Sequence, residues 1–376
     1  MKRKFYYSCL VSALLLAACS SDVEIPVTGE TPADGIRFDT SVVSGGADTR
    51  AVLSGTQFPV GGTFPIGIYM TNPGATTAYQ HGWSTGDVAG QYRNVYVSLK
   101  VTGTTLAPVY TWSGYGNSNR EALVPAGRMV FEVGGTPTDV KADFYAYYPQ
   151  QAKTTVPSLD AVPFDLINQD DVLFSYHKGY SKAQMHTGTD PVTFKFFHAM
   201  SLIAVQVKNT GLLPIKVEGA QVSNDAGSDA HVSTTGKLNL AAAVIAGDEL
   251  SATCPVIADA PAANAAIKNV LTTAISLNPA QEASTNQLIY LLIPPTASPA
   301  ATDVQRIKLI LTVDGYPTSS CLLPLPLISG GSNDGKYGFE QGKMHTYKIN
   351  INASAISFES LSIGQWTAGA GSTIII

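Results

Sequence analysis

The chain has 376 residues, of which 45% are hydrophobic and 14% are charged, and its formal net charge at pH 7 is −5. A soluble domain ordinarily carries about 25% charged residues, so this composition excludes a charged, disordered chain. The 34 glycines and 22 prolines exclude long uninterrupted helices over most of the sequence. The negative charge argues against duplex nucleic acid as a partner, and the length favours about two domains.

The first 18 residues have the order of an export signal. A basic cluster at residues 2–4 is followed by an apolar stretch over residues 5–16 and by small residues directly before Cys19. The apolar stretch is shorter than the roughly 20 residues that cross a bilayer. We therefore predict that residues 1–18 are a signal peptide removed on export, and that the mature chain has no membrane-spanning helix.

The end of this signal, Leu16-Ala17-Ala18-Cys19, resembles the lipobox of bacterial lipoproteins, in which the cysteine thiol is acylated. Polar residues follow directly at 20–22. A lipid at Cys19 would tether the protein to a membrane face, because several acyl chains anchor a protein stably where one is marginal. An ordinary signal peptide with an incidental cysteine is the alternative.

The chain contains four cysteines. Cys9 leaves with the signal and Cys19 carries the lipid, so Cys254 and Cys321 remain in the mature protein. Export permits a disulfide between these two, but the bond forms only where the Cα atoms lie within about 7 Å. Two buried free thiols are the alternative, and the sequence leaves both open.

Most of the chain after residue 35 has the pattern of short strands separated by turns. Residues 20–35 contain prolines, glycines and acids, a composition that suits an extended tether. The alternating or apolar runs that follow have the length of single sheet strands. We predict strands at residues 36–38, 64–70, 95–101, 144–148, within 192–207, and at 288–293, 306–313, 347–351 and 373–376. This pattern predicts an all-β chain of antiparallel β-sandwiches.

One alanine-rich segment, residues 240–275, departs from this pattern. Alanine favours helix and proline suits the first helical turn, so we predict a short helix from Asp259 through Pro261 to Val270. An ordered loop on a sandwich is the alternative.

The sequence lacks the common motifs of catalysis. No two of its six histidines have the i, i+4 spacing that holds a metal on one helical face. Neither a Gly-x-Ser-x-Gly elbow nor a Gly-x-x-x-x-Gly-Lys-Ser/Thr phosphate loop occurs. We therefore predict a protein that is not an enzyme, with no catalytic residue, no cofactor and no metal.

Three other groups of residues have a structural interpretation. The oxygen-rich clusters at 224–229 and 332–335 lack the closing glutamate of a calcium loop, so we interpret them as turns. The tyrosines within residues 145–148 could stack on sugar rings, but their place in a strand favours the core. His198, inside an apolar strand, is predicted to be a hydrogen-bonded core residue.

Five runs of aromatic and aliphatic residues occur in the order found in one family. They are residues 143–149 (DFYAYYP), 170–173 (DDVL), 194–203 (FKFFHAMSLI), 342–349 (GKMHTYKI) and 363–366 (IGQW). With the lipobox, they resemble the fimbrillin (Mfa-like) family of Bacteroidetes surface lipoproteins. The resemblance implies two transthyretin-like antiparallel β-sandwich domains in tandem, residues 51–190 and 191–376, in a subunit of type V pili.

The resemblance also implies an assembly mechanism. In that family the lipidated precursor reaches the outer membrane, where an arginine-specific protease removes an N-terminal strand and opens a groove. A strand from another pilin subunit fills it, because the incoming strand satisfies unpaired N–H and C=O groups and apolar pockets. The candidate scissile bond is Arg50-Ala51, so that residues 19–50 form a leader or propeptide. Arg37 is the competing site but lies in a predicted strand, and an ordinary solvated Arg50 is the alternative.

The candidate donor strand is residues 366–376, in which the bulky or branched side chains are Trp366, Thr373, Ile374, Ile375 and Ile376. A C-terminal strand that completes its own sheet is the alternative. The resemblance further implies exposure at the outer membrane and in fimbriae, with adhesion to a host or bacterial surface ligand. A glycan-binding surface lipoprotein and a non-polymerising tip or anchor pilin are the alternative functions.

Overall fold

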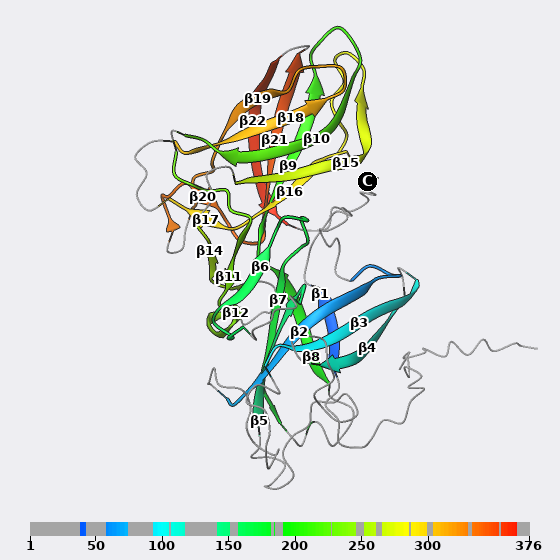
Figure 1. Cartoon of the computed structure of the whole chain (residues 1–376), viewed down its shortest axis with the longest axis vertical. Coiled ribbons are helices and arrows are strands. Elements are labelled where there is room, and N and C mark those ends of the chain that lie inside the picture. The colour runs from blue at the N-terminus through cyan, green and yellow to red at the C-terminus, as the bar shows by residue number, and fades with distance from the viewer. Residues whose placement is uncertain are drawn as a thin grey trace, which may run out of the picture. The chain divides into compact units, whose positions relative to one another are not determined.

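The computed structural model describes residues 38–42, 58–73, 93–104, 107–116, 141–150, 157–181, 184, 191–226, 228–245, 252–260, 265–285, 287–298, 304–329, 333–352 and 355–366. They form β-strands joined by turns, and the prediction of an all-β chain of antiparallel sandwiches is confirmed (Figure 1). All of them belong to one compact unit, Ala33–Ile376. Within these residues no helix has the length and apolar character needed to cross a membrane.

The first sheet has seven strands in the order β1-β8-β7-β5-β2-β3-β4. These are β1 (Phe38–Val42), β8 (Val192–His198), β7 (Leu173–Ser181), β5 (Lys141–Tyr148), β2 (Thr63–Thr71), β3 (Val95–Thr104) and β4 (Ala107–Gly116). β1 pairs with β8 in parallel, and the other neighbouring pairs are antiparallel. The two outer strands, β1 and β4, also contact each other, so the sheet curls around its own core.

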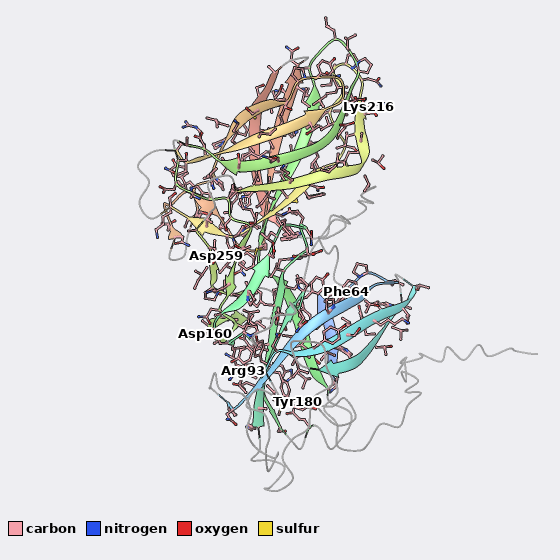
Figure 2. All side chains as sticks on the ribbon, in the orientation of Figure 1. Phe64, Arg93, Asp160, Tyr180, Lys216 and Asp259 are labelled. Atoms are coloured by element: carbon pink, nitrogen blue, oxygen red, sulfur yellow. The ribbon has the colours of Figure 1, made fainter. Side chains whose placement is uncertain are left out.

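The core of this sheet follows from the alternation of its strands. In β3 every second side chain from Val95 to Val101 is buried, while the side chains between them are partly or fully exposed. Together with side chains from the other strands they form the first hydrophobic cluster, to which Phe64 and Tyr180 in Figure 2 belong. The cluster is rich in aromatic rings on β2, β5, β7 and β8.

Two four-stranded sheets form a second sandwich. One has the order β15-β10-β18-β19, with β15 (Ala266–Leu277), β10 (Ile215–Asn224), β18 (Arg306–Val313) and β19 (Ser319–Pro324). The other has the order β16-β9-β21-β22, with β16 (Ile289–Ile293), β9 (Ser201–Asn209), β21 (Lys343–Asn352) and β22 (Ala355–Gln365). Side chains such as Val217, Leu309 and Tyr347 form its core, the second hydrophobic cluster.

Shorter elements complete the described fold. One three-stranded sheet has the order β14-β11-β6, with β14 (Val256–Ala258), β11 (Thr235–Leu238) and β6 (Val162–Asp165), and two strand pairs are β12 (Val244–Ile245) with β13 (Ala252–Thr253) and β17 (Thr296–Ala297) with β20 (Gly338–Phe339). A 3-10 turn covers Leu240–Ala242. A third hydrophobic cluster joins side chains of β5, β7, β9 and β16 with Trp366.

Strand alternation predicted the middle of the chain better than composition did. The run at 306–313 is β18, and the run at 192–207 divides into β8 and β9. The helix predicted to run to Val270 is wrong, because β15 begins at Ala266 and pairs antiparallel with β10. This pairing, with Ile267 buried in the second cluster, outweighs a helix preference of at most about 1 kcal/mol per residue. The strand predicted at 373–376 lies outside the described residues.

The first sheet includes a strand from each side of the boundary predicted between residues 190 and 191. β8 begins at Val192, and it pairs with β7 on one side and with β1 on the other. The division of the chain into domains at this boundary stays a prediction.

His345 on β21 links the stability of the fold to pH. Its ring is fully buried and lies edge-on to Phe339, with the ring centroids 5.1 Å apart. Burial, assisted by the charge of Lys343, lowers the pKa of His345 from 6.5 to about 4. As the pH falls below 6.5, the unfolded chain therefore binds a proton at this residue that the folded chain does not bind.

We predict that, because of His345, the free energy of unfolding is about 3 kcal/mol smaller at pH 4 than at pH 7. The substitution His345→Gln removes the titrating group and should flatten this part of the pH dependence. Urea unfolding at a series of pH values measures the effect. Equal slopes for the variant and the natural protein would contradict the assignment.

Candidate functional site

β1 is the first strand of the described chain and forms one edge of the first sheet. Its five residues run parallel to β8, from Phe38 opposite Val192 to Val42 opposite Phe196. Figure 1 shows β1 as a short dark blue strand among the green and cyan strands of this sheet. Parallel neighbours cannot be joined by a tight hairpin, so this pairing brings together segments far apart in the sequence.

The backbone groups of β8 divide between its two neighbours. Thr193 donates its N–H to Nδ1 of His177 on β7 at 3.3 Å, and Ala199 donates its N–H to the carbonyl of Val172 at 2.8 Å. Because successive residues of a strand direct their backbone groups to opposite sides, the even-numbered residues 192, 194 and 196 direct theirs towards β1. β1 therefore covers the backbone groups on this side of β8.

The same even-numbered residues of β8 supply aromatic side chains to the first hydrophobic cluster. Phe194 and Phe196 are fully buried, with ring centroids 6.0 Å apart. Phe194 also contacts Trp112 on β4 at 6.4 Å, and Phe196 contacts Phe58 edge-on at 5.5 Å. Since β1 pairs with β8 and contacts β4, it lies beside this aromatic group. Loss of β1 would therefore uncover apolar side chains together with unpaired backbone groups.

Trp366 is held at the C-terminal end of the same strand. The indole ring stacks on His198, the last residue of β8, with centroids 3.7 Å apart and planes at 16°. Nδ1 of His198 lies 2.9 Å from a carboxylate oxygen of Asp171, and both side chains are buried. Trp366 also donates its backbone N–H to the carbonyl of Gly342 at 3.1 Å. His198 is thus a core residue as predicted, and this stack was not foreseeable from sequence spacing.

Several residues predicted from motifs lie outside the described part of the chain. These are Cys19, Arg50, Ala51, Thr373, Ile374, Ile375 and Ile376. Trp366, which the sequence analysis placed in the donor strand, is only 1% exposed and belongs to the third hydrophobic cluster of its own chain. Trp366 therefore packs in the core of its own subunit, and the donor role of residues 366–376 stays a prediction.

Cys254 and Cys321 are free thiols in the structure. Cys254 belongs to the third hydrophobic cluster, and its thiol donates to the carbonyl of Asn239 at 3.4 Å. Cys321, on β19, packs against the second cluster. Burial raises the pKa of Cys254 to about 12 and the pKa of Cys321 to about 11.

The tyrosines considered for sugar stacking lie mainly inside the protein. Tyr145 is 4% exposed and Tyr147 is 1% exposed, and Tyr147 donates its hydroxyl to Oδ1 of Asn94 at 2.6 Å. Tyr148 is partly buried against the first cluster. The core interpretation of these residues is confirmed.

The oxygen-rich cluster that begins at Asn224 acts as a turn. The side chain of Asn224 donates through Nδ2 to the carbonyl of Val232 at 2.9 Å, and its Oδ1 accepts from the N–H groups of His231 and Val232. Among the described residues no group of three His, Cys, Asp or Glu side chains could hold a metal. A cavity lined by Lys216 and Asp314 has a volume of about 250 Å³, which is smaller than the roughly 300–1,000 Å³ typical of ligand pockets. Figure 2 labels Lys216.

The described part of the chain is thus an all-β protein in which β1, at one edge of its sheet, precedes Arg50. A model of the fimbrillin-like family matches residues 49–366. The chain therefore belongs to the fimbrillin-like family. A search of curated proteins found no match.

Solved structures with a similar chain trace include fimbrial proteins. A candidate cell adhesion protein from Bacteroides uniformis is 17% identical, with 90% of this chain and 100% of that chain covered and a TM-score of 0.49. A fimbrial protein from Bacteroides vulgatus is 18% identical, with 89% and 100% covered and a TM-score of 0.42. The tip fimbrial protein Mfa3 from Porphyromonas gingivalis is 10% identical, with 81% and 100% covered and a TM-score of 0.32.

We predict that both thiols react slowly in the folded protein, because burial raises their pKa values and keeps them protonated at pH 8. In a chain that begins at residue 20, a thiol reagent should modify the native protein more than about a hundredfold more slowly than the unfolded protein. After unfolding without reductant, the protein should react with two equivalents of the reagent, one for each thiol. The Cys321→Ser variant should react with one equivalent. A chain with both cysteines that reacts with none would contradict the prediction.

Proposed function

We propose that this protein is a structural subunit of a cell-surface pilus that polymerises by donor-strand exchange. In this proposal an arginine-specific protease cuts the lipidated precursor at Arg50-Ala51, and β1 leaves with residues 19–50. The observation that carries the proposal is the position of β1. It is an edge strand before Arg50, and it covers the backbone groups of residues 192, 194 and 196.

The order of these steps follows from the order of Cys19, β1 and Arg50 along the chain. The lipid at Cys19 would hold the precursor at the outer membrane, and the cut would separate the mature chain from both the lipid and β1. The family match begins at residue 49, so β1 lies before the residues that the family model covers. This boundary supports a leader that is distinct from the mature subunit.

The free energy for assembly would come from the edge that β1 leaves open. Each buried backbone group without a partner costs about 1–3 kcal/mol, and Phe194 and Phe196 would lose apolar cover as well. An incoming strand restores both contributions at once. The unpaired edge would therefore favour association with another subunit over an open groove.

The donor segment follows the anchor at Trp366. Residues 367–376 number ten and, fully extended, reach about 33 Å, which is longer than the five-residue β1. The β-branched side chains of Thr373, Ile374, Ile375 and Ile376 suit a strand that fills apolar pockets. The stack on His198 would fix the base of this donor in its own subunit.

The proposal predicts that treatment of the purified precursor with an arginine-specific protease yields an N-terminus at Ala51 and a ladder of polymers on an unheated gel. Arg50→Ala should leave the chain uncut at this bond and monomeric, because β1 then stays on β8. Arg37→Ala is the matched control and should polymerise as the natural chain does. A ladder from Arg50→Ala, or a cut natural chain without a ladder, would overturn the proposal.

A chain that ends at Trp366 separates the donor from the acceptor in the same assay. It keeps the buried indole, so it should fold and be cut at Arg50 but form no ladder by itself. Circular dichroism checks its fold. Polymers from this shortened chain would refute the donor role of residues 367–376.

A further inference from the structure

β16 is a second edge strand and carries a continuous apolar run. It lies at one end of the sheet β16-β9-β21-β22 and pairs with β9. All five of its residues, from Ile289 to Ile293, are buried. A short apolar edge of this kind is a template for pairing with another chain unless its outer backbone groups are covered.

Side-chain amides cover three outer backbone groups of β16. The carbonyl of Tyr290 accepts a hydrogen bond from Nδ2 of Asn269 at 2.7 Å. The N–H of Leu292 donates to Oε1 of Gln169 at 2.6 Å, and its carbonyl accepts from Nε2 of the same side chain at 3.4 Å. Tyr290 and Leu292 are two residues apart, so their backbone groups point to the same side of the strand. The two amides thus occupy the place of a neighbouring strand.

Both amides are fixed by the elements that carry them. Gln169 is 8% exposed, has a positive φ of 58°, and donates its own N–H to the carbonyl of Leu166 at 3.0 Å. Asn269 lies on β15, whose backbone pairs with β10 at this position. The cap on β16 is therefore built from a buried turn and from a strand of the facing sheet.

The two edges are covered in different ways. β8 is covered by main chain from β1, which comes before Arg50 and which the proposed cut releases. β16 is covered by Gln169 and Asn269, which come after Arg50 and stay in the mature chain. Cleavage therefore changes the cover of one edge and leaves the other as it was.

We propose that the side chains of Gln169 and Asn269 close the outer edge of β16 to strand addition, so that β16 does not compete with β8 for an incoming strand. This inference rests on the proposed function, in which β8 is the edge that accepts a strand. It adds the residues that keep β16 from accepting a strand.

The test uses the full-length Arg50→Ala chain, which keeps β1 in place. Replacing both amides, by Gln169→Leu with Asn269→Leu, removes the hydrogen bonds while keeping apolar volume at the edge. We expect the amide of Leu292 to exchange hydrogen about fivefold or more faster, and oligomers to form without cleavage. Hydrogen exchange of the segment over β16 and light scattering of the eluted protein give the two readouts.

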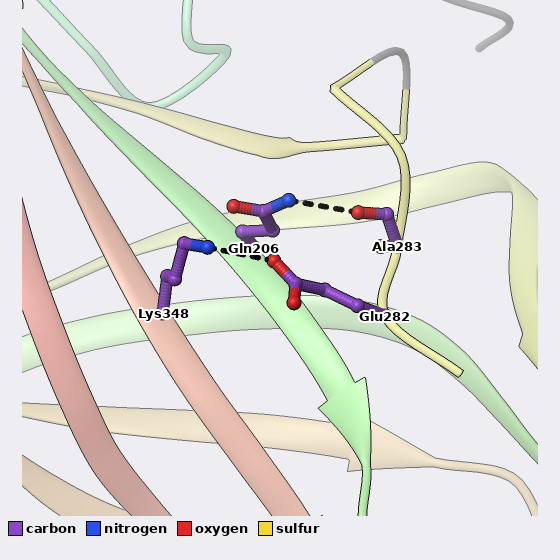
Figure 3. A network of polar contacts seen from close by, with 4 residues as sticks. All are labelled: Gln206, Glu282, Ala283 and Lys348. Carbon is purple, nitrogen blue, oxygen red and sulfur yellow. Dashed lines mark hydrogen bonds and ion pairs between the residues drawn. The ribbon is translucent and has the colours of Figure 1, made fainter. Parts of the chain in front are cut away.

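Gln206→Leu is the matched control. Nε2 of Gln206 donates to the carbonyl of Ala283 at 2.8 Å, beside the surface ion pair of Lys348 with Glu282 (Figure 3). This change also removes one amide from a backbone carbonyl, but β9 lies between β16 and β21, so no strand edge is opened. The control should stay monomeric and keep the protection of Leu292.

A double variant that stays monomeric although Leu292 has lost its protection would overturn the inference. If the double variant does not fold by circular dichroism, Gln169→Ala alone serves, and unchanged exchange at Leu292 would overturn it equally. The outcome is independent of the proposed function, because every chain in this test is uncut at Arg50. Failure of the natural chain to polymerise after cleavage would refute the proposed function and leave the result at β16 standing.

Discussion

The parallel pairing of β1 with β8 is the contact on which the proposed activity of the subunit depends. β8 has β7 on one side and β1 on the other, and its side chains Val192, Phe194 and Phe196 lie in the first hydrophobic cluster. Removal of one short strand would therefore unpair backbone groups directly beside Phe194 and Phe196. An added strand would stabilise this edge by pairing its backbone groups and covering its apolar side chains.

The edges of β8 and β16 are covered in two different ways. Main chain covers β8, and a single cut between the cover and the rest of the subunit would release it. Side-chain amides of Gln169 and Asn269 cover β16, and no cut before residue 51 affects them. A subunit that polymerises needs one open edge rather than two, because a second open edge would branch or misdirect the assembly.

Local patterns predicted the strands well where the alternation of side chains was strong, as at 306–313, and the all-β class followed from them. The helix expected to run to Val270 was wrong from Ala266 on, because alanine content was weighed without the pairing of β15 with β10. The parallel partner of β1, the stack of Trp366 on His198 and the caps on β16 join residues far apart in sequence. No local spacing encodes these contacts. The predictions at Cys19 and Arg50 come from motifs in residues that the structure does not describe, so they stay predictions.

The most direct measurement of the central claim is amide hydrogen exchange at residues 192, 194 and 196, before and after cleavage at Arg50. In the uncut chain these amides should be protected, because they face β1. In a cut chain that ends at Trp366 and cannot supply a donor, their protection should fall while that of the β18 amides is unchanged. Protection that persists at these three residues after the cut and the release of residues 19–50 would contradict the role assigned to β1.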